Sequence, residues 1–246
     1  MESILEAQQL NNQGVKALER GDDESALTSL AKAIRILKQQ IASAPNPEDD
    51  AADEDSKKMS FASSAQHSTV MLPEMGEQHQ SFIFNEALNL SRPPGSQYDE
   101  ELTEHDVHVY TGVVIFNLAL AHHRRGKDGQ VATGRGGCLT KADKLYGMAL
   151  KVLAHDFTNS VSVLVKLASI NNMAEIRFEM GDNDSARTGL QLLSKLLQQC
   201  SDSTLSNSTR SMSSSIADSP MFQEPQIQGL LMNVLLLRAP KVAPAA

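Results

Sequence analysis

Aromatic residues are scarce in this sequence of 246 residues, since Phe, Tyr and Trp together make up 4% and Trp is absent. Apolar residues nevertheless make up 41% of the chain, and Ala and Leu dominate among them. Sheet cores favour aromatic and β-branched side chains, whereas Ala and Leu favour helices. The composition therefore predicts a core of closely packed helices.

Clustered positive charge is also lacking, because no long run of Lys or Arg occurs and the formal net charge is -8. Acidic residues gather in the stretch PNPEDDAADEDSKK, and the remainder of the chain is only mildly acidic. A surface that binds nucleic acid needs clustered cations to neutralise the phosphates. We therefore expect no nucleic-acid partner.

Long apolar runs and cysteine motifs are missing as well. Cys138 and Cys200 lie in no CxxC motif or disulfide framework, so both are predicted to be reduced thiols. The opening MESILEAQQL lacks the basic and apolar regions of a signal peptide, and LLMNVLLLR is shorter than the roughly 20 apolar residues of a membrane span. We expect a soluble intracellular protein without a membrane partner, cytoplasmic by default, with the nucleus as the alternative.

Two nearly identical hexapeptides, GDDESA from residue 21 and GDNDSA from residue 181, each lie between segments with helical apolar periodicity. Gly21 can adopt the left-handed conformation that ends a helix. Asp22 or Asp23 then offers a carboxylate to the free N–H groups that open the next helix. Each hexapeptide therefore predicts a helix end followed by a helix start. The predicted helices span 2–20 and 24–40 at the first site, and 160–180 and 184–200 at the second.

The flanking helices repeat too, because NNQGVKALERGDDESALTSLAKA aligns without a gap with NNMAEIRFEMGDNDSARTGLQLL. A third copy is FNLALAHHRRG followed by LTKADKLYGMAL, with an insertion in its elbow. This pattern resembles the tetratricopeptide repeat (TPR), whose hairpins of about 34 residues place small residues where two helices cross. The small residues would be Gly14, Ala119 and Ala174 on the first helices, and Ala26, Ala142 and Ala186 on the second. The alternative is an unrelated helical bundle with Ala-rich seams, since the family's early Trp and terminal Pro are missing.

The resemblance implies an all-α fold, a TPR-like α-solenoid of antiparallel helix pairs, with helices over 104–125 and 139–154 forming the middle pair. The expected organisation is TPR-like unit 1 over 2–40, an acidic disordered linker over 43–66, an insertion with extended segments over 67–103, unit 2 with an inserted Gly-rich elbow over 104–154, unit 3 over 160–200, a Ser-rich disordered linker over 201–222 and a capping helix over 225–238. Within the insertion, STVML and SFIFN predict a short β-hairpin or docked extended strands.

Asparagine recurs at one repeat position, as Asn12, Asn117 and Asn172, two residues before each small crossing residue. In TPR proteins this position commonly faces the concave groove. A carboxamide both donates and accepts hydrogen bonds, so a row of them can bind the backbone of an extended peptide whatever its sequence. We therefore predict a peptide-binding groove. The alternative is that these amides brace neighbouring helices.

The other predicted groove positions argue against one binding mode known in the TPR family, the binding of chaperone tails. They also suggest that the groove has a basic edge. Chaperone-tail grooves clamp a terminal carboxylate with Lys and Arg, and the corresponding positions here do not carry such residues. They hold Asn11, Val15, Phe116, Leu120, Asn171 and Glu175. The run His123, Arg124 and Arg125 would supply a basic edge, or else a solvated helix end. The candidate groove residues are thus Asn12, Asn117, Asn172, His123, Arg124 and Glu175.

The sequence contains no convincing catalytic, metal or cofactor motif. His105 and His108 share a helical face, but without an HExxH or Cys-His set a polar helix start explains them equally well. The loop GKDGQVATGRGGC lacks the GxxxxGK[ST] spacing of a phosphate-binding loop. We therefore expect no metal, no cofactor and no enzymatic activity.

The function expected from these features is that of a non-catalytic adaptor that holds a partner peptide or helix in its groove. In a second hypothesis, the segment with STVML and SFIFN occupies the groove itself until a partner displaces it. The competing class is an enzyme or a helical domain that binds a small ligand in a pocket under the long insertions. The Ser-rich tract 201–219 offers sites for phosphorylation, or serves only as a flexible linker.

Overall fold

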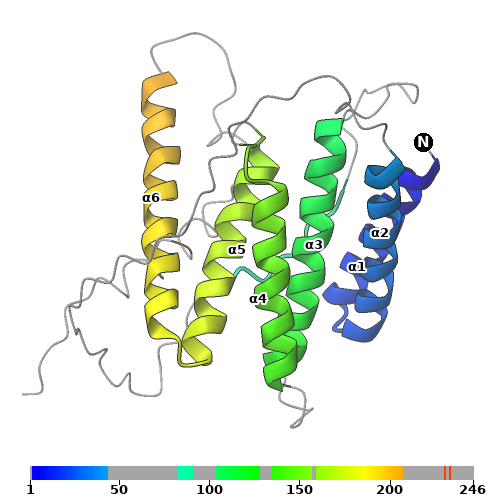
Figure 1. The fold of residues 1–246 in the computed structure, drawn as a ribbon, viewed down its shortest axis with the longest axis horizontal. Coiled ribbons are helices and arrows are strands. Elements are labelled where there is room, and N and C mark those ends of the chain that lie inside the picture. Colours follow the sequence, from blue (N-terminus) through cyan, green and yellow to red (C-terminus); the bar gives the residue numbers. More distant parts are fainter. Residues whose placement is uncertain are drawn as a thin grey trace, which may run out of the picture.

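The computed structural model describes residues 2–43, 83–90, 104–127, 135–156, 159–207, 230 and 233. Among these residues the regular structure is entirely helical and no strand occurs, which confirms the all-α expectation. Figure 1 shows the helices side by side in chain order. They are α1 (Glu2–Glu19), α2 (Asp23–Ser43), α3 (Glu104–Lys127), α4 (Arg135–Val152), α5 (Ser160–Glu179) and α6 (Asn183–Asn207).

The helix ends lie close to their predicted places, with two differences. Helix α4 begins at Arg135, so the end of the predicted Gly-rich elbow is helical. Helix α6 continues through Asn207, so the Ser-rich linker does not begin at residue 201 as predicted. The sequence SDSTLSN from residue 201 contains neither Gly nor Pro, and Ser, Asp and Asn weaken a helix without breaking it.

Several predicted features lie outside the described residues. These are the acidic linker beyond residue 43, the STVML run, the elbow residues 128–134 and the Ser-rich residues 208–222. The described part of the insertion, residues 83–90, forms no strand, so no β-hairpin occurs among these residues. Of the predicted capping helix, only Leu230 and Asn233 are described, and both are helical.

Glycine ends the first helix of each hexapeptide pair, as predicted. Gly21 has a φ of 74° and Gly181 a φ of 81°, both in the left-handed region. Around Gly21, the N–H of Asp22 donates to the carbonyl of Ala17 at 2.9 Å, and the N–H of Gly21 donates to Leu18 at 3.0 Å. This Schellman pattern satisfies carbonyls that the end of α1 would otherwise leave unpaired. The same pair of bonds closes α5 at Gly181.

Aspartate then opens the second helix of each pair. The Oδ1 atom of Asp22 accepts from the N–H of Ser25 at 3.1 Å, so Asp22 and not Asp23 is the capping residue. Asp182 accepts from Ser185 at 3.2 Å in the same way. The hydrogen bonds from these serines hold the pKa of both aspartates below the ordinary value. The two hexapeptides therefore have the same local structure because they supply the same two signals.

Replacing Gly21 or Gly181 by Ala should lower the free energy of unfolding by about 1 kcal/mol each, because an L side chain is strained at positive φ. No heavy atom within 4 Å would meet the added Cβ at either site, so the backbone alone sets this cost. Urea denaturation of the two variants measures it. Asn tolerates this conformation better, so Gly→Asn at each site should cost less, and equal losses for Ala and Asn would contradict the explanation.

Helix α3 lies at the centre of the packing. It contacts α2 and α4, its nearest helices in the chain, and also α1 and α5. Its buried residues, from Val109 to Gly126, lie all around the helix. The pair α1–α2 thus packs against α3 although a long stretch of sequence separates them, as expected for a hairpin that cannot bury its own apolar face.

Small residues allow the paired helices to approach closely. The predicted crossing residues Ala26, Ala119 and Ala142 are fully buried, and Ala174 and Ala186 are almost so. Gly14 leaves no room for a Cβ, which would lie 2.6 Å from Cγ of Leu30. One apolar cluster joins residues from α1 to α5, and a smaller one joins α5 and α6 with Leu230.

Candidate functional site

An extended segment, residues 83–90, lies across the first helix of each pair (Figure 1). It runs from α5 past α3 to α1, opposite to the order of the helices in the chain. Its buried side chains are Phe84, Leu88 and Leu90, and its exposed ones are Asn85, Glu86 and Asn89. The three buried side chains belong to the main apolar cluster.

Three asparagines, here called the asparagine ladder (Asn12, Asn117 and Asn172), hold the backbone of this segment. Each carboxamide accepts from the N–H of one segment residue and donates to the carbonyl of the same residue, as a neighbouring β-strand would. These three residues are the ones predicted to bind the backbone of an extended peptide. The pairs are Asn172 with Phe84 (2.9 and 3.0 Å), Asn117 with Leu88 (2.9 and 2.8 Å) and Asn12 with Leu90 (2.9 and 2.8 Å).

Two further amides of α1 reinforce the ladder. Asn11 donates to the carbonyl of Leu88 at 3.1 Å and accepts from Asn117 at 2.8 Å. Gln8 donates to the carbonyl of Leu90 at 2.9 Å. Asn11 was predicted to lie in the groove without a role, and Gln8 was not predicted. Gln8 lies one helical turn before Asn12, on the same face of the helix, and this spacing could have identified it as a groove residue.

Aromatic rings surround the first buried position of the segment. The Phe84 ring meets Phe116 of α3 edge to face, with centroids 6.0 Å apart, and Phe116 lies 5.6 Å from the ring of Tyr146. The Tyr146 hydroxyl accepts from Nδ2 of Asn172 at 3.0 Å, and burial raises the pKa of Tyr146. The ladder residue that binds Phe84 is thus itself fixed by a buried neutral phenol.

Arg124 contacts the second position of the segment. Its Nε donates to the side-chain oxygen of Asn85 at 2.6 Å, and its Nη2 donates to the Asn85 carbonyl at 2.7 Å. The remaining nitrogen, Nη1, donates to the carbonyl of Leu18 in α1 at 2.7 Å. The guanidinium therefore joins α3, α1 and the segment.

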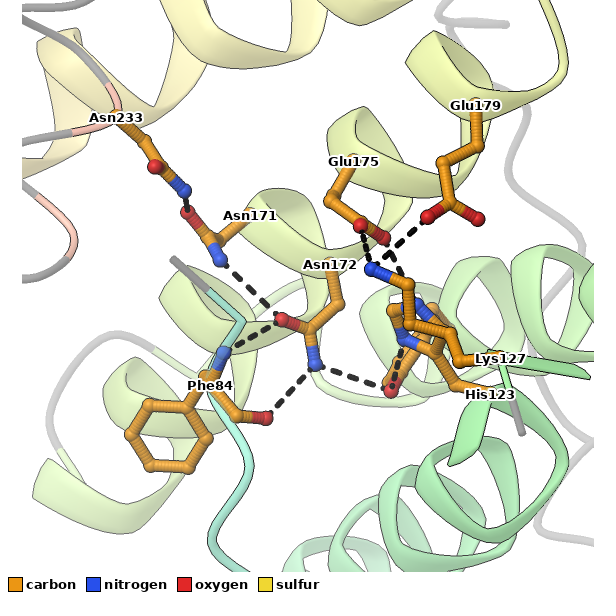
Figure 2. A network of polar contacts seen from close by, with 9 residues as sticks. Phe84, His123, Lys127, Asn171, Asn172, Glu175, Glu179 and Asn233 are labelled. Carbon is orange, nitrogen blue, oxygen red and sulfur yellow. Dashed lines mark hydrogen bonds and ion pairs between the residues drawn. The ribbon is translucent and has the colours of Figure 1, made fainter. Parts of the chain in front are cut away.

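His123 and Glu175 form a buried pair (Figure 2), and the His123 ring lies 6.1 Å from the ring of Tyr146. His123 is 1% exposed and Glu175 is 4% exposed, and Nε2 lies 2.9 Å from Oε2. Lys127 also binds Glu175, and it lies 2.9 Å from Glu179. His123 was expected at a basic edge or a solvated helix end. His123 lies at neither place, because its side chain turns inward to the carboxylate of Glu175.

Glu175 and Lys127 shift each other's pKa in opposite directions. Burial alone would raise the pKa of Glu175, but the hydrogen bonds and charges of His123 and Lys127 bring it below its ordinary value. Burial alone would lower the pKa of Lys127, yet the hydrogen bonds from Glu175 and Glu179 raise it. Both side chains are therefore held in their charged forms at neutral pH.

A continuous polar chain links this pair to the segment, as Figure 2 shows. Asn172 donates to the Tyr146 hydroxyl, which lies 3.5 Å from Nδ1 of His123. On the other side, Asn171 donates to Asn172 at 3.2 Å and accepts from Asn233 at 2.7 Å. The ladder residue on α5 is thus fixed from both sides.

The other candidate sites of the sequence have structural contacts. His105 lies 3.5 Å from the carboxylate of Asp156, and Nδ1 of His108 lies 2.9 Å from the carbonyl of Glu104. Within the described ranges, no group of three or more His, Cys, Asp or Glu side chains is arranged to hold a metal ion. No helix in the same part of the chain is long and apolar enough to cross a membrane.

Comparison with known proteins finds no matching family model, no matching curated protein and no matching solved structure. The resemblance to the tetratricopeptide repeat therefore rests on the repeated motifs of the sequence.

Proposed function

We propose that this chain is a non-catalytic adaptor, a TPR-like solenoid whose groove along α1, α3 and α5 binds an extended peptide of a partner protein. The observation that carries the proposal is the asparagine ladder, whose three carboxamides each make two hydrogen bonds to one backbone residue of residues 83–90. Main-chain bonds of this kind provide affinity in peptide recognition by strand addition.

The partners of the ladder residues support a binding role over a purely bracing one. Asn117 also donates to Asn11 of α1, and Asn172 also donates to Tyr146 of α4. Each ladder residue in addition makes two hydrogen bonds to the segment backbone, which bracing of the helices alone would not require. In addition, Asn117 and Asn172 are fully buried, and a buried amide without partners costs about 1–3 kcal/mol. Binding of an extended chain in the site is therefore favourable, because its backbone supplies partners for these buried amides.

The chain's own segment fills the site in the absence of a partner. A tethered segment competes at an effective concentration in the millimolar range when its linkers are short and flexible. Each ~1.4 kcal/mol of docking free energy weakens the affinity of an external peptide tenfold. We propose that a partner peptide binds by displacing residues 83–90.

The test uses the full chain with Phe84→Asp and Leu88→Asp, called the opened variant, and a fluorescent synthetic peptide of residues 81–92. The two carboxylates cannot enter the apolar cluster, so the internal segment should leave the site. We expect the peptide to bind the opened variant, to raise its melting temperature and to bind the wild-type chain at least tenfold more weakly.

Asn12, Asn117 and Asn172 changed together to Ala in the opened variant should weaken peptide binding at least a hundredfold, because six hydrogen bonds are lost. Fluorescence anisotropy measures the affinity, and circular dichroism verifies that each variant remains helical. Asn183→Ala is the matched control, since Asn183 is exposed at the start of α6. Equal binding by the triple variant, or no binding to a folded opened variant, would contradict the proposal.

A further inference from the structure

The ladder fixes the register of a bound peptide as well as holding its backbone. Because each carboxamide binds both polar groups of one residue, a slip by a single residue would turn the buried side chains toward solvent. Phe84, Leu88 and Leu90 are therefore the positions whose side chains the site can select. Asn89 is exposed and should be free to vary.

The first position favours an aromatic ring. Phe84 is 1% exposed and packs edge to face on Phe116, and Tyr146 backs that ring. Edge-to-face pairs add attraction beyond the burial of apolar surface. An aliphatic side chain at this position would lose that contact and leave part of the space unfilled.

The second position faces Arg124, which uses two of its nitrogens on Asn85 and is anchored to Leu18 by the third. A side chain here must accept a hydrogen bond. A carboxylate would accept a stronger, charge-assisted one, whereas a cation would be repelled by the guanidinium. The position is exposed, so solvent and salt will moderate the effect.

The remaining selective positions are aliphatic. Leu88 and Leu90 are 8% and 5% exposed, and both join the main apolar cluster. Their carbonyls each accept two hydrogen bonds, since Asn11 and Gln8 add to the ladder there. The backbone of each of these two residues therefore makes three hydrogen bonds to the helices, one more than that of Phe84.

We infer that the partner is a protein segment with an aromatic residue, then Asn or Asp, and then Leu-like residues four and six positions after the aromatic one. It binds extended, with its N-terminal end at α5 and its C-terminal end at α1. This inference rests on the proposed function and adds the sequence class and direction of the bound peptide. Residues 83–90 are the chain's own copy of that pattern.

The experiment compares variants of the 81–92 peptide on the opened variant. Phe84→Ala and Leu88→Ala in the peptide should each weaken binding about thirtyfold, because a buried anchor is lost. Asn85→Lys should weaken it about tenfold, and Asn85→Asp should strengthen it severalfold at low salt. Asn89→Ala should change the affinity less than twofold, and a peptide of reversed sequence should not bind.

The contact with Arg124 is tested by a double-mutant cycle. In the opened variant with Arg124→Ala, peptides with Asn, Asp and Lys at position 85 should bind within about twofold of each other. If the opened variant does not fold, the milder Phe84→Ala with Leu88→Ala takes its place. Equal binding of all substituted peptides would overturn this inference alone. No binding of the parent peptide to a folded chain would overturn the proposed function as well.

Discussion

Replacing Glu175 by Ala should lower the free energy of unfolding by about 3 kcal/mol, one of the largest effects expected in this protein. The carboxylate is buried and accepts from both His123 and Lys127. Removing Glu175 leaves the buried Nε2–H of His123 without its acceptor, and an unpaired buried donor is costly. Lys127 retains Glu179, so the loss should come mainly from His123.

The pH dependence distinguishes the charged pair from simple packing. Because the folded pKa of Glu175 lies below its ordinary value of 4.5, its contribution is present above pH 4.5 and lost as pH falls through the folded pKa. The pKa of Lys127 is raised above 10.5, so its contribution is present below pH 10.5 and lost as pH rises through the folded value. The stability difference between wild type and a Glu175 variant should therefore be largest between these limits.

Glu175→Gln is the matched variant for this prediction, since it keeps the shape and one acceptor oxygen and removes the charge. We expect it to cost less than Glu175→Ala. Urea denaturation from pH 3 to pH 8 provides the measurement. A wild-type advantage over Glu175→Gln that stays constant down to pH 3 would show that the charge does not contribute as proposed.

Replacing Gly112 by Val should lower the free energy of unfolding by about 3 kcal/mol, because the position has no room for any side chain. A Cβ at Gly112 would lie 2.6 Å from Cγ and 2.7 Å from both Cδ atoms of Leu153. Leu153 is 1% exposed, so its side chain cannot move toward solvent without breaking the contact between α3 and α4. Val is a better helix former than Gly by a few tenths of a kcal/mol, which offsets only a small part of this cost.

The control for Gly112 is another glycine within a helix. At Gly147 of α4 an added Cβ would meet only Cε of Met173 at 3.9 Å, an ordinary contact. Gly147→Ala should therefore stabilise the protein by up to about 1 kcal/mol, whereas Gly112→Ala should destabilise it. Thermal denaturation of both variants gives the comparison. Stabilisation by Gly112→Ala would refute the close packing of α3 on α4.

Local signals made the helix ends predictable. Gly21 and Asp22 act on atoms within a few residues, so their hexapeptide determines a helix end and a helix start wherever it occurs. The end of α6 was predicted less well, because a serine-rich sequence without Gly or Pro carries no strong signal to stop. Helix ends that depend on weak propensities cannot be located from sequence alone.

The ladder was predictable for a related reason. Asn12, Asn117 and Asn172 recur at one repeat position, and equal positions in equal hairpins face the same way. Their partners in residues 83–90 were not fixed by this pattern. The carboxamides can bind the backbone N–H and carbonyl groups of a foreign peptide as well as those of the chain's own SFIFN region.

The helices of the described residues, the repeated elbows and the asparagines aligned on their helices were predictable, because each follows from interactions between near neighbours in the chain. Three contacts became evident only from the packing of the helices: His123 turns inward to Glu175, Arg124 meets Asn85, and Gly112 lies over Leu153. Those contacts join residues far apart in the sequence. Their partners are selected by how the helices pack, which no local pattern records.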